Sequence, residues 1–341
     1  MTVPPLPVEI YSQILDHVGH TDLYALLFVC RVLHREAEKR LYRKFTIDEL
    51  NAHRVFTTMT RLIPNGGRVG RYIHFLDMYH VNPSSDLIKA LAESYVFLPN
   101  LLFLSLPYAS DPLVIPPPSA PFSLTTFHVR PMEGDAILSA VKVFLESQHS
   151  IVDFLITKPT PLSLLPTALP NLRILQAYPE SLKHIISGRT VTHLSIYGDE
   201  LRFGAEKLDM PSLKSLRITY PDTLSHFQDN HPNLELLQMY FVRTYLLASD
   251  PTLLTCAQFD SEPLRKYLPS MPKLLFLDCI TEMTAEQLLE MFKISPRLRH
   301  IDCRAEKPLW RTGIRVSRWI LEDGQLVLTE SDWSDNTWKE V

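Results

Sequence analysis

A short phrase of spaced apolar residues recurs along most of the 341-residue chain, and it limits the possible folds more than any other feature. The plainest copies carry a proline two places before the first apolar residue; they are PNLLFLSL (99–106), PNLRILQA (170–177), PSLKSLRI (211–218), PNLELLQM (232–239), PKLLFLDC (272–279) and PRLRHIDC (296–303). Weaker copies are IHFLDM (73–78), LTTFHV (124–129), IVDFLI (151–156), VTHLSI (191–196) and LTCAQF (254–259). The first apolar residues of successive copies lie 19 to 28 residues apart, and this period predicts stacked repeats that bury one continuous core.

The phrase resembles the LxxLxL strand of leucine-rich repeats. Its alternating apolar positions fit a strand with one buried face, and the resemblance implies a curved parallel sheet. Between the strands we expect helical or irregular connections, such as ESLKHIIS (180–187) and AEQLLEMF (285–292). The family usually carries asparagine three places after the third apolar residue, and its absence here predicts irregular turns. That position holds, for example, Glu180, Asp199, Pro221 and Val242.

The first 47 residues follow a different, helical pattern. Apolar residues recur at helical spacing from Ile10 to Val18. Pro7 suits the first turn of that helix, and Gly19 is a natural helix stop. Thr21 can cap a second helix, and a third is expected around residues 35–43, where charged residues form a solvated face.

The second helix, expected over residues 23–33, is apolar on both faces. One face carries Leu23, Leu26, Leu27, Cys30 and Leu33, and the other carries Tyr24, Ala25, Phe28, Val29 and Val32. A helix that is apolar all round must be buried all round, but three helices in about forty residues make a core too small to be stable alone. Either the rest of the chain or another protein must therefore cover the second face.

Several residues of this segment resemble the F-box. They are Leu6-Pro7-x-Glu9-Ile10, Ile14, Asp22-Leu23, Leu26, Val29-Cys30-Arg31 and Leu41-Tyr42-Arg43. Tyr42 departs from the tryptophan that many F-boxes carry, although an aromatic ring is retained. The resemblance implies that a Skp-type adaptor, and through it a cullin, binds here; the alternative is an N-terminal cap that packs only on its own repeats. The implied adaptor-binding residues are Leu6, Pro7, Ile10, Ile14, Leu23, Leu26, Val29, Cys30, Leu41 and Tyr42.

Four segments follow from these patterns: an F-box over 1–47, a linker over 48–70, the repeats over 71–305, and a cap hairpin with an acidic tail over 306–341. The expected fold class is α/β, with a three-helix F-box before a leucine-rich-repeat-like solenoid. Asp323-Gly324 between apolar runs predicts the hairpin, which would cap the open edge of the sheet. Six prolines in 107–122 argue against a regular element there. We expect a long surface loop, which is either a substrate lid or docking segment, or a tolerated insertion.

Composition and motifs exclude several classes of function. A net charge of −4 argues against bulk nucleic-acid binding but not against a local basic patch, and only 10 glycines argue against a phosphate-binding loop. The common nucleotide-binding, kinase, hydrolase and zinc-protease signatures are absent from the sequence, so we expect no catalytic residue, metal or cofactor. With no signal peptide and no run long enough to span a membrane, a cytoplasmic or nuclear protein is expected. Buried thiols in a reducing compartment fit the four cysteines, which are Cys30, Cys256, Cys279 and Cys303.

A protein substrate is the remaining expected partner. The residues between the apolar anchors lie on the face opposite the core, and the seventh position holds tyrosine in four of the eleven copies. Tyrosine is common at binding hot spots; the alternative is that these rings pack between adjacent repeats. We expect a substrate receptor of a Skp-cullin-F-box ubiquitin ligase, or else a non-degradative interaction scaffold. The candidate substrate-binding residues are Tyr79, Tyr178, Tyr197, Arg217, Tyr240, Asp278 and Arg304.

Overall fold

The chain folds as two compact units, each combining helices with a mostly parallel sheet. Unit 1 is Met1–Lys158 with Thr167–Asn171, and unit 2 is Pro159–Pro166 with Leu172–Val341. The mixed α/β class expected from the sequence is confirmed. The computed structural model describes residues 7–48, 51, 69–78, 82–108, 110–130, 134–158, 162–197, 208–219, 223–224, 227, 232–239, 262–279, 283–305 and 315–329.

Unit 1 begins with three short helices. They are α1 (Val8–Leu15), α2 (His20–Leu26) and α3 (Arg31–Leu41). The expectation of one helix over residues 23–33 was wrong, because residues 27–29 form a turn and Cys30 takes an extended backbone (φ −157°, ψ 166°) before α3. The expected cap at Thr21 was also wrong, since Gly19 is the residue that precedes α2. Apolar spacing continues across the turn, so the pattern alone did not reveal the break.

The sheet of unit 1 follows the repeated phrase. Its strands are β1 (Lys44–Thr46), β2 (Phe75–Asp77), β3 (Phe103–Ser105), β4 (Thr126–Val129) and β5 (Asp153–Ile156), and each pairs in parallel with the next. Leu76, Leu104, Phe127 and Phe154 are fully buried in one register row.

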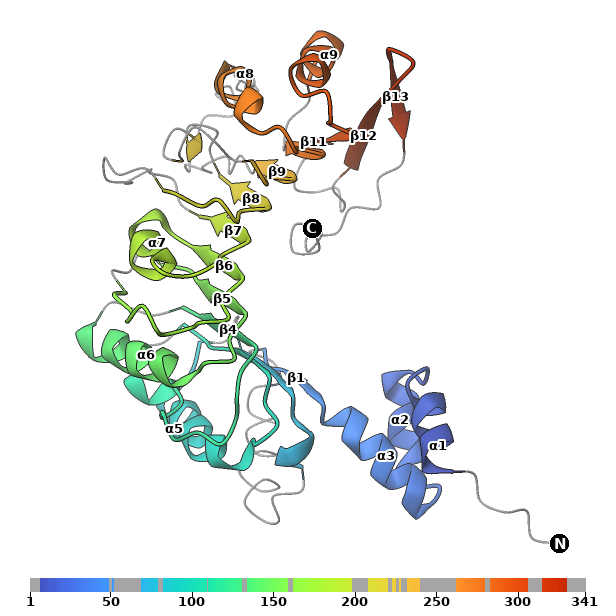
Figure 1. Cartoon of the computed structure of the whole chain (residues 1–341). Helices are drawn as coiled ribbons and strands as arrows, with labels where there is room; N and C mark the ends of the chain where they lie inside the picture. The colour runs from blue at the N-terminus through green and yellow to red at the C-terminus, as the bar shows by residue number, and fades with distance from the viewer. Residues whose placement is uncertain are drawn as a thin grey trace, which may run out of the picture. The chain divides into compact units, whose positions relative to one another are not determined.

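Helices cover the buried face of this sheet (Figure 1). After the short 3-10 helix η1 (Gly70–Tyr72), the connections are α5 (Ser85–Ser94) with η2 (Tyr95–Phe97), and α6 (Asp135–Ser147). The ring of Phe144 on α6 lies 5.2 Å from the ring of Phe127, centroid to centroid. The opposite face of the sheet carries the alternate residues of each strand.

The proline-rich segment 107–122 is only in part the expected surface loop, because several of its residues are exposed but others are buried in the core. It contains a 3-10 helix, η3 (Pro112–Val114), that packs against α5 and α6. Val114, Ile115 and Phe122 are buried, and the hydroxyl of Tyr95 donates to the carbonyl oxygen of Val114 over 2.6 Å. The prolines exclude an α-helix, but the apolar residues between them still fill the space that a helix covers in other repeats.

Asparagine side chains join consecutive repeats. In three plain copies of the phrase, an asparagine stands directly before the first apolar residue. Its side chain donates a hydrogen bond to a backbone carbonyl oxygen of the preceding copy, and that carbonyl lies two residues before the first apolar residue there. The bonds are Asn100 Nδ2 to Arg71 O (2.7 Å), Asn171 Nδ2 to His149 O (2.9 Å) and Asn233 Nδ2 to Pro211 O (2.7 Å). This asparagine satisfies backbone acceptors at the turn.

Unit 2 continues the same scheme. Its strands are β6 (Ile174–Ala177), β7 (His193–Ile196), β8 (Ser215–Ile218), β9 (Leu236–Met239), β10 (Phe276–Cys279), β11 (His300–Ala305), β12 (Arg315–Glu322) and β13 (Gln325–Thr329). Strands β6 to β11 pair in parallel in chain order, and Leu175, Leu194, Leu216, Leu237, Leu277 and Ile301 form one fully buried row. The copy LTCAQF lies outside the described residues, and β9 pairs directly with β10.

The helices of unit 2 follow the expected connections. They are α7 (Pro179–Ile186), α8 (Glu262–Tyr267) with η6 (Leu268–Ser270), and α9 (Ala285–Ile294). Thr284 and Gln287 form a capping box at the start of α9. The predicted stretches 180–187 and 285–292 are therefore confirmed as helical.

The predicted C-terminal hairpin is confirmed. β12 pairs antiparallel with both β11 and β13, and the two-residue turn is Asp323-Gly324. Both turn residues have positive φ, 49° and 81°, as a type I′ turn requires. The acidic tail after residue 329 lies outside the described residues.

Candidate partner-binding surfaces

The three N-terminal helices enclose a small core of their own. Leu15, Leu23, Ala37 and Leu41 are buried in it, and Val18, Leu26, Leu27, Leu33 and Tyr42 pack against them half-buried. The first of the two apolar sets expected from the sequence therefore supplies much of this internal core. The helices need no partner for that set.

The second apolar set is exposed. Phe28 is 87% exposed and Val29 is 63% exposed, both in the turn between α2 and α3. Large apolar side chains on all three helices are open in the same way. We call the following residues the helical apolar surface: Val8, Ile10, Ile14, Tyr24, Phe28, Val29 and Val32.

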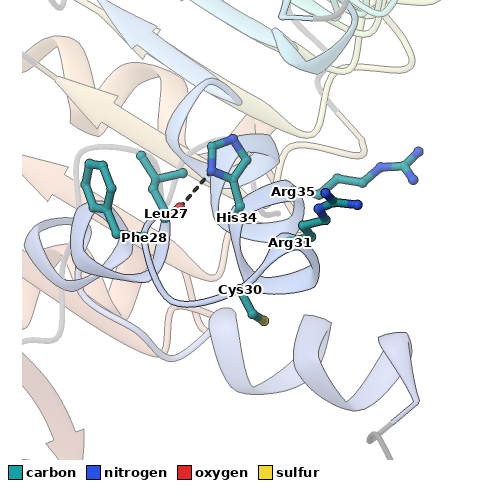
Figure 2. A pocket seen from close by; sticks show the side chains of 6 residues that line it. All are labelled: Leu27, Phe28, Cys30, Arg31, His34 and Arg35. Atoms are coloured by element: carbon teal, nitrogen blue, oxygen red, sulfur yellow. Dashed lines mark hydrogen bonds between the residues drawn. The ribbon is translucent and has the colours of Figure 1, made fainter.

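A hydrogen bond fixes the turn that presents Phe28. Nδ1 of His34, on α3, donates to the carbonyl oxygen of Leu27 over 2.7 Å. A hollow of about 520 Å³ lies beside this residue pair. Figure 2 shows the bond, with the side chains of Arg31 and Arg35 extending away from the Phe28 ring. The lining of the hollow therefore combines apolar side chains with two basic ones.

Cys30 lines this hollow and is exposed, so the expectation of buried thiols was wrong for this residue. The turn between α2 and α3 brings Cys30 to the surface. Cys279 and Cys303 are buried as expected, and Cys256 lies outside the described residues.

A polar clamp holds α1 on α3. The guanidinium of Arg40 donates to Asp16 Oδ1 from Nε (3.0 Å) and Nη2 (2.8 Å), and also to Ser12 Oγ (2.9 Å). A polar hollow of about 350 Å³ lies beside this clamp, lined in part by Tyr72 and His74 from the start of the repeats. The clamp sets the spacing of the two helices that carry Ile14 and Val32.

The ten residues implied as adaptor contacts divide into four groups. Pro7, Ile10, Ile14, Val29 and Cys30 are exposed, whereas Leu26 and Tyr42 are half-buried. Leu23 and Leu41 belong to the internal core, and Leu6 lies outside the described residues. Val8, Tyr24, Phe28 and Val32 were missing from that set, although three of them already stood out as the second apolar face of the sequence.

The open face of unit 2 carries a row of polar side chains at one register position. The register joins each member to the next across neighbouring strands. We call this set the polar row: Gln176, Ser195, Arg217, Gln238, Asp278, Asp302 and Arg318.

Much of the polar row is buried and bonded within the protein. Gln238 Nε2 donates to Asp278 Oδ2 over 2.6 Å, and both residues are buried. Arg318 donates to Asp302 with Nε (2.8 Å) and Nη2 (2.9 Å) in a bidentate pair. The side chain of Asp278, a candidate substrate contact, is therefore buried and hydrogen-bonded within the protein, whereas Arg217 is half-buried.

Two of the candidate tyrosines lie side by side. Tyr178 and Tyr197 follow the paired strands β6 and β7, and their ring centroids are 6.4 Å apart. The hydroxyl of Tyr197 donates to Gln176 Oε1 of the polar row over 2.7 Å, and both rings are half-buried. Tyr79, Tyr240 and the side chain of Arg304 lie outside the described residues, and the role of all these residues in binding stays a prediction.

A neutral histidine adjoins the polar row. His300 packs against Phe276 with ring centroids 4.5 Å apart. Burial lowers the pKa of His300 from 6.5 to about 4; Asp302 opposes the shift, and Arg318 and Arg299 add to it. The imidazole is therefore uncharged at neutral pH.

The open face of unit 1 carries an aromatic row that the sequence did not reveal. Phe75 and Phe103 pair in register and stack with ring centroids 3.8 Å apart and planes inclined by 10°. Lys44 Nζ lies 4.6 Å from the Phe75 centroid, and the ring of His128 meets Phe103 edge-on at 5.0 Å. His128 Nε2 is in turn 3.9 Å from Asp153 Oδ2. The only sequence signal was phenylalanine at the same place in two neighbouring copies of the phrase.

Two observations on the described side chains bear on metal binding and on nucleophilic chemistry. Within the described part of the chain, no three His, Cys, Asp or Glu side chains gather as metal ligands would. Burial raises the pKa of the Cys279 thiol well above its usual value, with smaller contributions from Cys303 and two aspartates, so this sulfur is a poor nucleophile. A scan of protein-family models and a search of curated proteins find no match to the chain.

Proposed function

We propose that this protein is the substrate-recognition subunit of a Skp-cullin-F-box ubiquitin ligase. The observation that carries the proposal is the helical apolar surface. Its side chains come from three helices that already have a core of their own, so folding of unit 1 does not cover them. Together with the F-box-like residues of the segment, this supports α1 to α3 as an F-box that binds a Skp-type adaptor and, through it, a cullin.

The exposed area is large enough to drive binding. A phenylalanine side chain offers roughly 150–250 Å², and Phe28 is 87% exposed. At about 25 cal/mol per Å², complete burial of this one ring is worth about 3–5 kcal/mol before the entropy of association is subtracted. Several large apolar side chains exposed on one small helical segment are typical of a protein-protein interface. Arg31 and Arg35 at its margin favour an adaptor with acidic residues beside its apolar groove.

The strands of both units serve as the substrate side of the proposed receptor, as those of a leucine-rich-repeat-like solenoid do. Each has an open face opposite its helices, with the aromatic row on unit 1 and the tyrosine pair on unit 2. The chain itself forms no bond; it raises the effective concentration of a bound protein substrate near the ubiquitin-charged enzyme. We place this activity in the cytoplasm, the nucleus or both.

A charge placed in the helical apolar surface tests the adaptor assignment. Val29→Asp should weaken binding of a Skp-type adaptor by roughly thirtyfold or more, because the carboxylate must be desolvated in the interface. Val96→Asp is the matched control, because Val96 is also in unit 1 and is 59% exposed against 63% for Val29. Binding is measured by calorimetry on full-length chains. Equal affinities for the two variants would refute the F-box assignment.

Ubiquitin transfer separates the proposed receptor from a non-degradative scaffold. A partner captured through the repeats should be ubiquitinated when adaptor, cullin and charged enzyme are added. The same reaction with Val29→Asp should lose transfer while the partner stays bound to the repeats. Adaptor binding without transfer to any captured partner would favour the scaffold.

A further inference from the structure

Among the described residues, strand β13 is the last strand of the sheet and has one side without a neighbouring strand. Among the described strands it pairs only with β12. Its sequence, QLVLT, has no charged residue, whereas edge strands of monomeric proteins are commonly protected by lysine, proline or a bulge. Leu328 is 49% exposed, and Leu321 on the neighbouring strand β12 is 39% exposed.

The hairpin geometry fixes which backbone groups face outward. In a hairpin with a two-residue turn, the residues flanking the turn form a hydrogen-bonded pair, and such pairs recur at every second position. Here Glu322 pairs with Gln325 and Ile320 pairs with Val327. The N–H and C=O groups of Leu326 and Leu328 therefore point away from β12 toward the open side.

The side chains next to this edge form an apolar band on one face. Trp319 lies opposite Leu328, and Leu321 lies opposite Leu326, all on the same face of the hairpin. Trp319 and Leu326 are half-buried, and Leu321 and Leu328 are exposed. A strand that offers both open backbone groups and apolar side chains is suited to pairing with another strand.

We propose that the occupant of this edge is β13 of a second copy of the chain, paired antiparallel about a two-fold axis at Val327. In that register Leu326 faces Leu328 of the second copy, and the two exchange both of their outward backbone hydrogen bonds. Val327 faces its own equivalent. The bands of Trp319 and Leu321 from both copies then become continuous with these leucines. The proposal concerns unit 2 alone and does not depend on the adaptor assignment.

Self-complementarity favours a second copy over an unrelated strand. Antiparallel pairing about Val327 sets Leu326 against Leu328 and Gln325 against Thr329, so apolar side chains meet apolar ones and polar side chains meet polar ones. Since the strand carries no charge, the two-fold axis brings no like charges together. A closed two-fold interface also occupies the open side of β13 in both copies, which prevents further copies from adding at this strand and growing into fibres.

Charge reversal at the axis tests this register. The full chain, of 39.2 kDa, should approach twice that mass in analytical ultracentrifugation as its concentration rises through the micromolar range. Val327→Lys places two ammonium groups opposite each other, and we expect dimerisation at least tenfold weaker, about 1.4 kcal/mol. Val327→Glu should do the same. An equimolar mixture of the two variants should dimerise again, because lysine then faces glutamate.

Ile320→Lys is the matched control. Ile320 pairs with Val327 on the same face but lies one strand further from the edge. Lysines at this position would be about 14 Å apart in the dimer, three strand spacings, which exceeds the screening length in physiological salt. Its dimerisation should therefore stay within about threefold of the unsubstituted chain.

If lysine at 327 lowers the melting temperature, Leu328→Pro provides a second test. It removes one outward N–H while leaving the bonds to β12 intact, which edge strands tolerate, and dimerisation should again weaken at least tenfold, or about 1.4 kcal/mol. A monomer at every concentration would overturn the proposal and leave this edge to a strand of another protein. A mixture of the lysine and glutamate variants that dimerises no better than either alone would overturn the register.

Discussion

Removing one member of the bidentate pair of Asp302 and Arg318 should destabilise unit 2 more than removing both members together. It joins β11 to β12, where the parallel sheet turns into the antiparallel hairpin. The Asp302 side chain is 1% exposed and the Arg318 side chain 21%. Taking one partner away leaves the other charge in a place that water hardly reaches.

The expected magnitudes follow from that burial. Asp302→Leu should lower the free energy of unfolding of unit 2 by about 3 kcal/mol, as removal of one member of a buried pair commonly does. Arg318→Met should cost about the same, because the buried carboxylate must then take up a proton. The double variant Asp302→Leu with Arg318→Met should lose only about 1 kcal/mol, since apolar side chains of similar volume often replace a buried ion pair without loss.

Urea denaturation followed by tryptophan fluorescence measures this. All four tryptophans, Trp310, Trp319, Trp333 and Trp338, belong to unit 2, so the signal reports on that unit.

Arg265→Met is the control for an exposed ion pair in the same unit. Arg265 lies 2.7 Å from Glu290, and the two side chains are 43% and 37% exposed, so we expect a change of at most about 1 kcal/mol. Single-variant losses that simply add up in the double variant would refute the claim that the two charges are coupled.

Three further outcomes are expected. Leu216→Ala, at a fully buried anchor of β8, should lower the free energy of unfolding by about 2–5 kcal/mol, whereas Leu165→Ala, 54% exposed, should change it by less than about 0.5 kcal/mol; equal melting curves would contradict the assignment of the repeat core. The pKa of His300 is about 4 in the folded protein, below its ordinary 6.5, so the unfolded chain binds the proton first and stability should fall as pH drops from about 6.5 to 4. The loss is about 1–2 kcal/mol after allowance for solvent screening, and His300→Gln should flatten this part of the pH profile. Tyr178→Ala with Tyr197→Ala should weaken substrate capture roughly thirtyfold while adaptor binding is unchanged; a variant that unfolds would show instead that the rings are core.

The sheet could be predicted because its signal is local. Each plain copy of the phrase places two apolar residues at alternate positions, and each became a strand, for example at Leu216 and Leu277. The asparagine before the first apolar residue could also have been found, since Asn100, Asn171 and Asn233 occupy the same place in their copies. The leucine-rich-repeat pattern has its asparagine at a different place, three residues after the third apolar residue, where this chain has none.

The elements that were predicted wrongly from the sequence depend on contacts that form only in the folded chain. The turn at residues 27–29 interrupts an unbroken apolar pattern and is held by His34, seven residues beyond Leu27. Segment 107–122 looked like a loop because its prolines outweighed Val114 and Ile115, whose burial depends on Tyr95 from another repeat.

The candidate binding surfaces were likewise only partly predictable from the sequence. The second apolar face of the helical segment was visible in the sequence, because the segment alone is too small to cover Tyr24, Phe28 and Val32 as well as its first face. The aromatic row was not, because the stacking of Phe75 on Phe103 exists only once the register of β2 and β3 is known. Face residues differ from one repeat to the next, so spacing alone does not show which of them meet.

The short junction between α3 and β1 couples the position of the helical segment to that of the first strand of the sheet. Only Tyr42 and Arg43 separate the two elements, and the carbonyl oxygen of Arg43 accepts hydrogen bonds from the backbone N–H groups of His74 (3.0 Å) and Phe75 (3.1 Å). A connector this short has no slack. A movement of α3 therefore also moves β1, beginning at Lys44 beside the aromatic row. In the proposed ubiquitin ligase, this short connection would limit how far a substrate bound on the sheet can move relative to the adaptor.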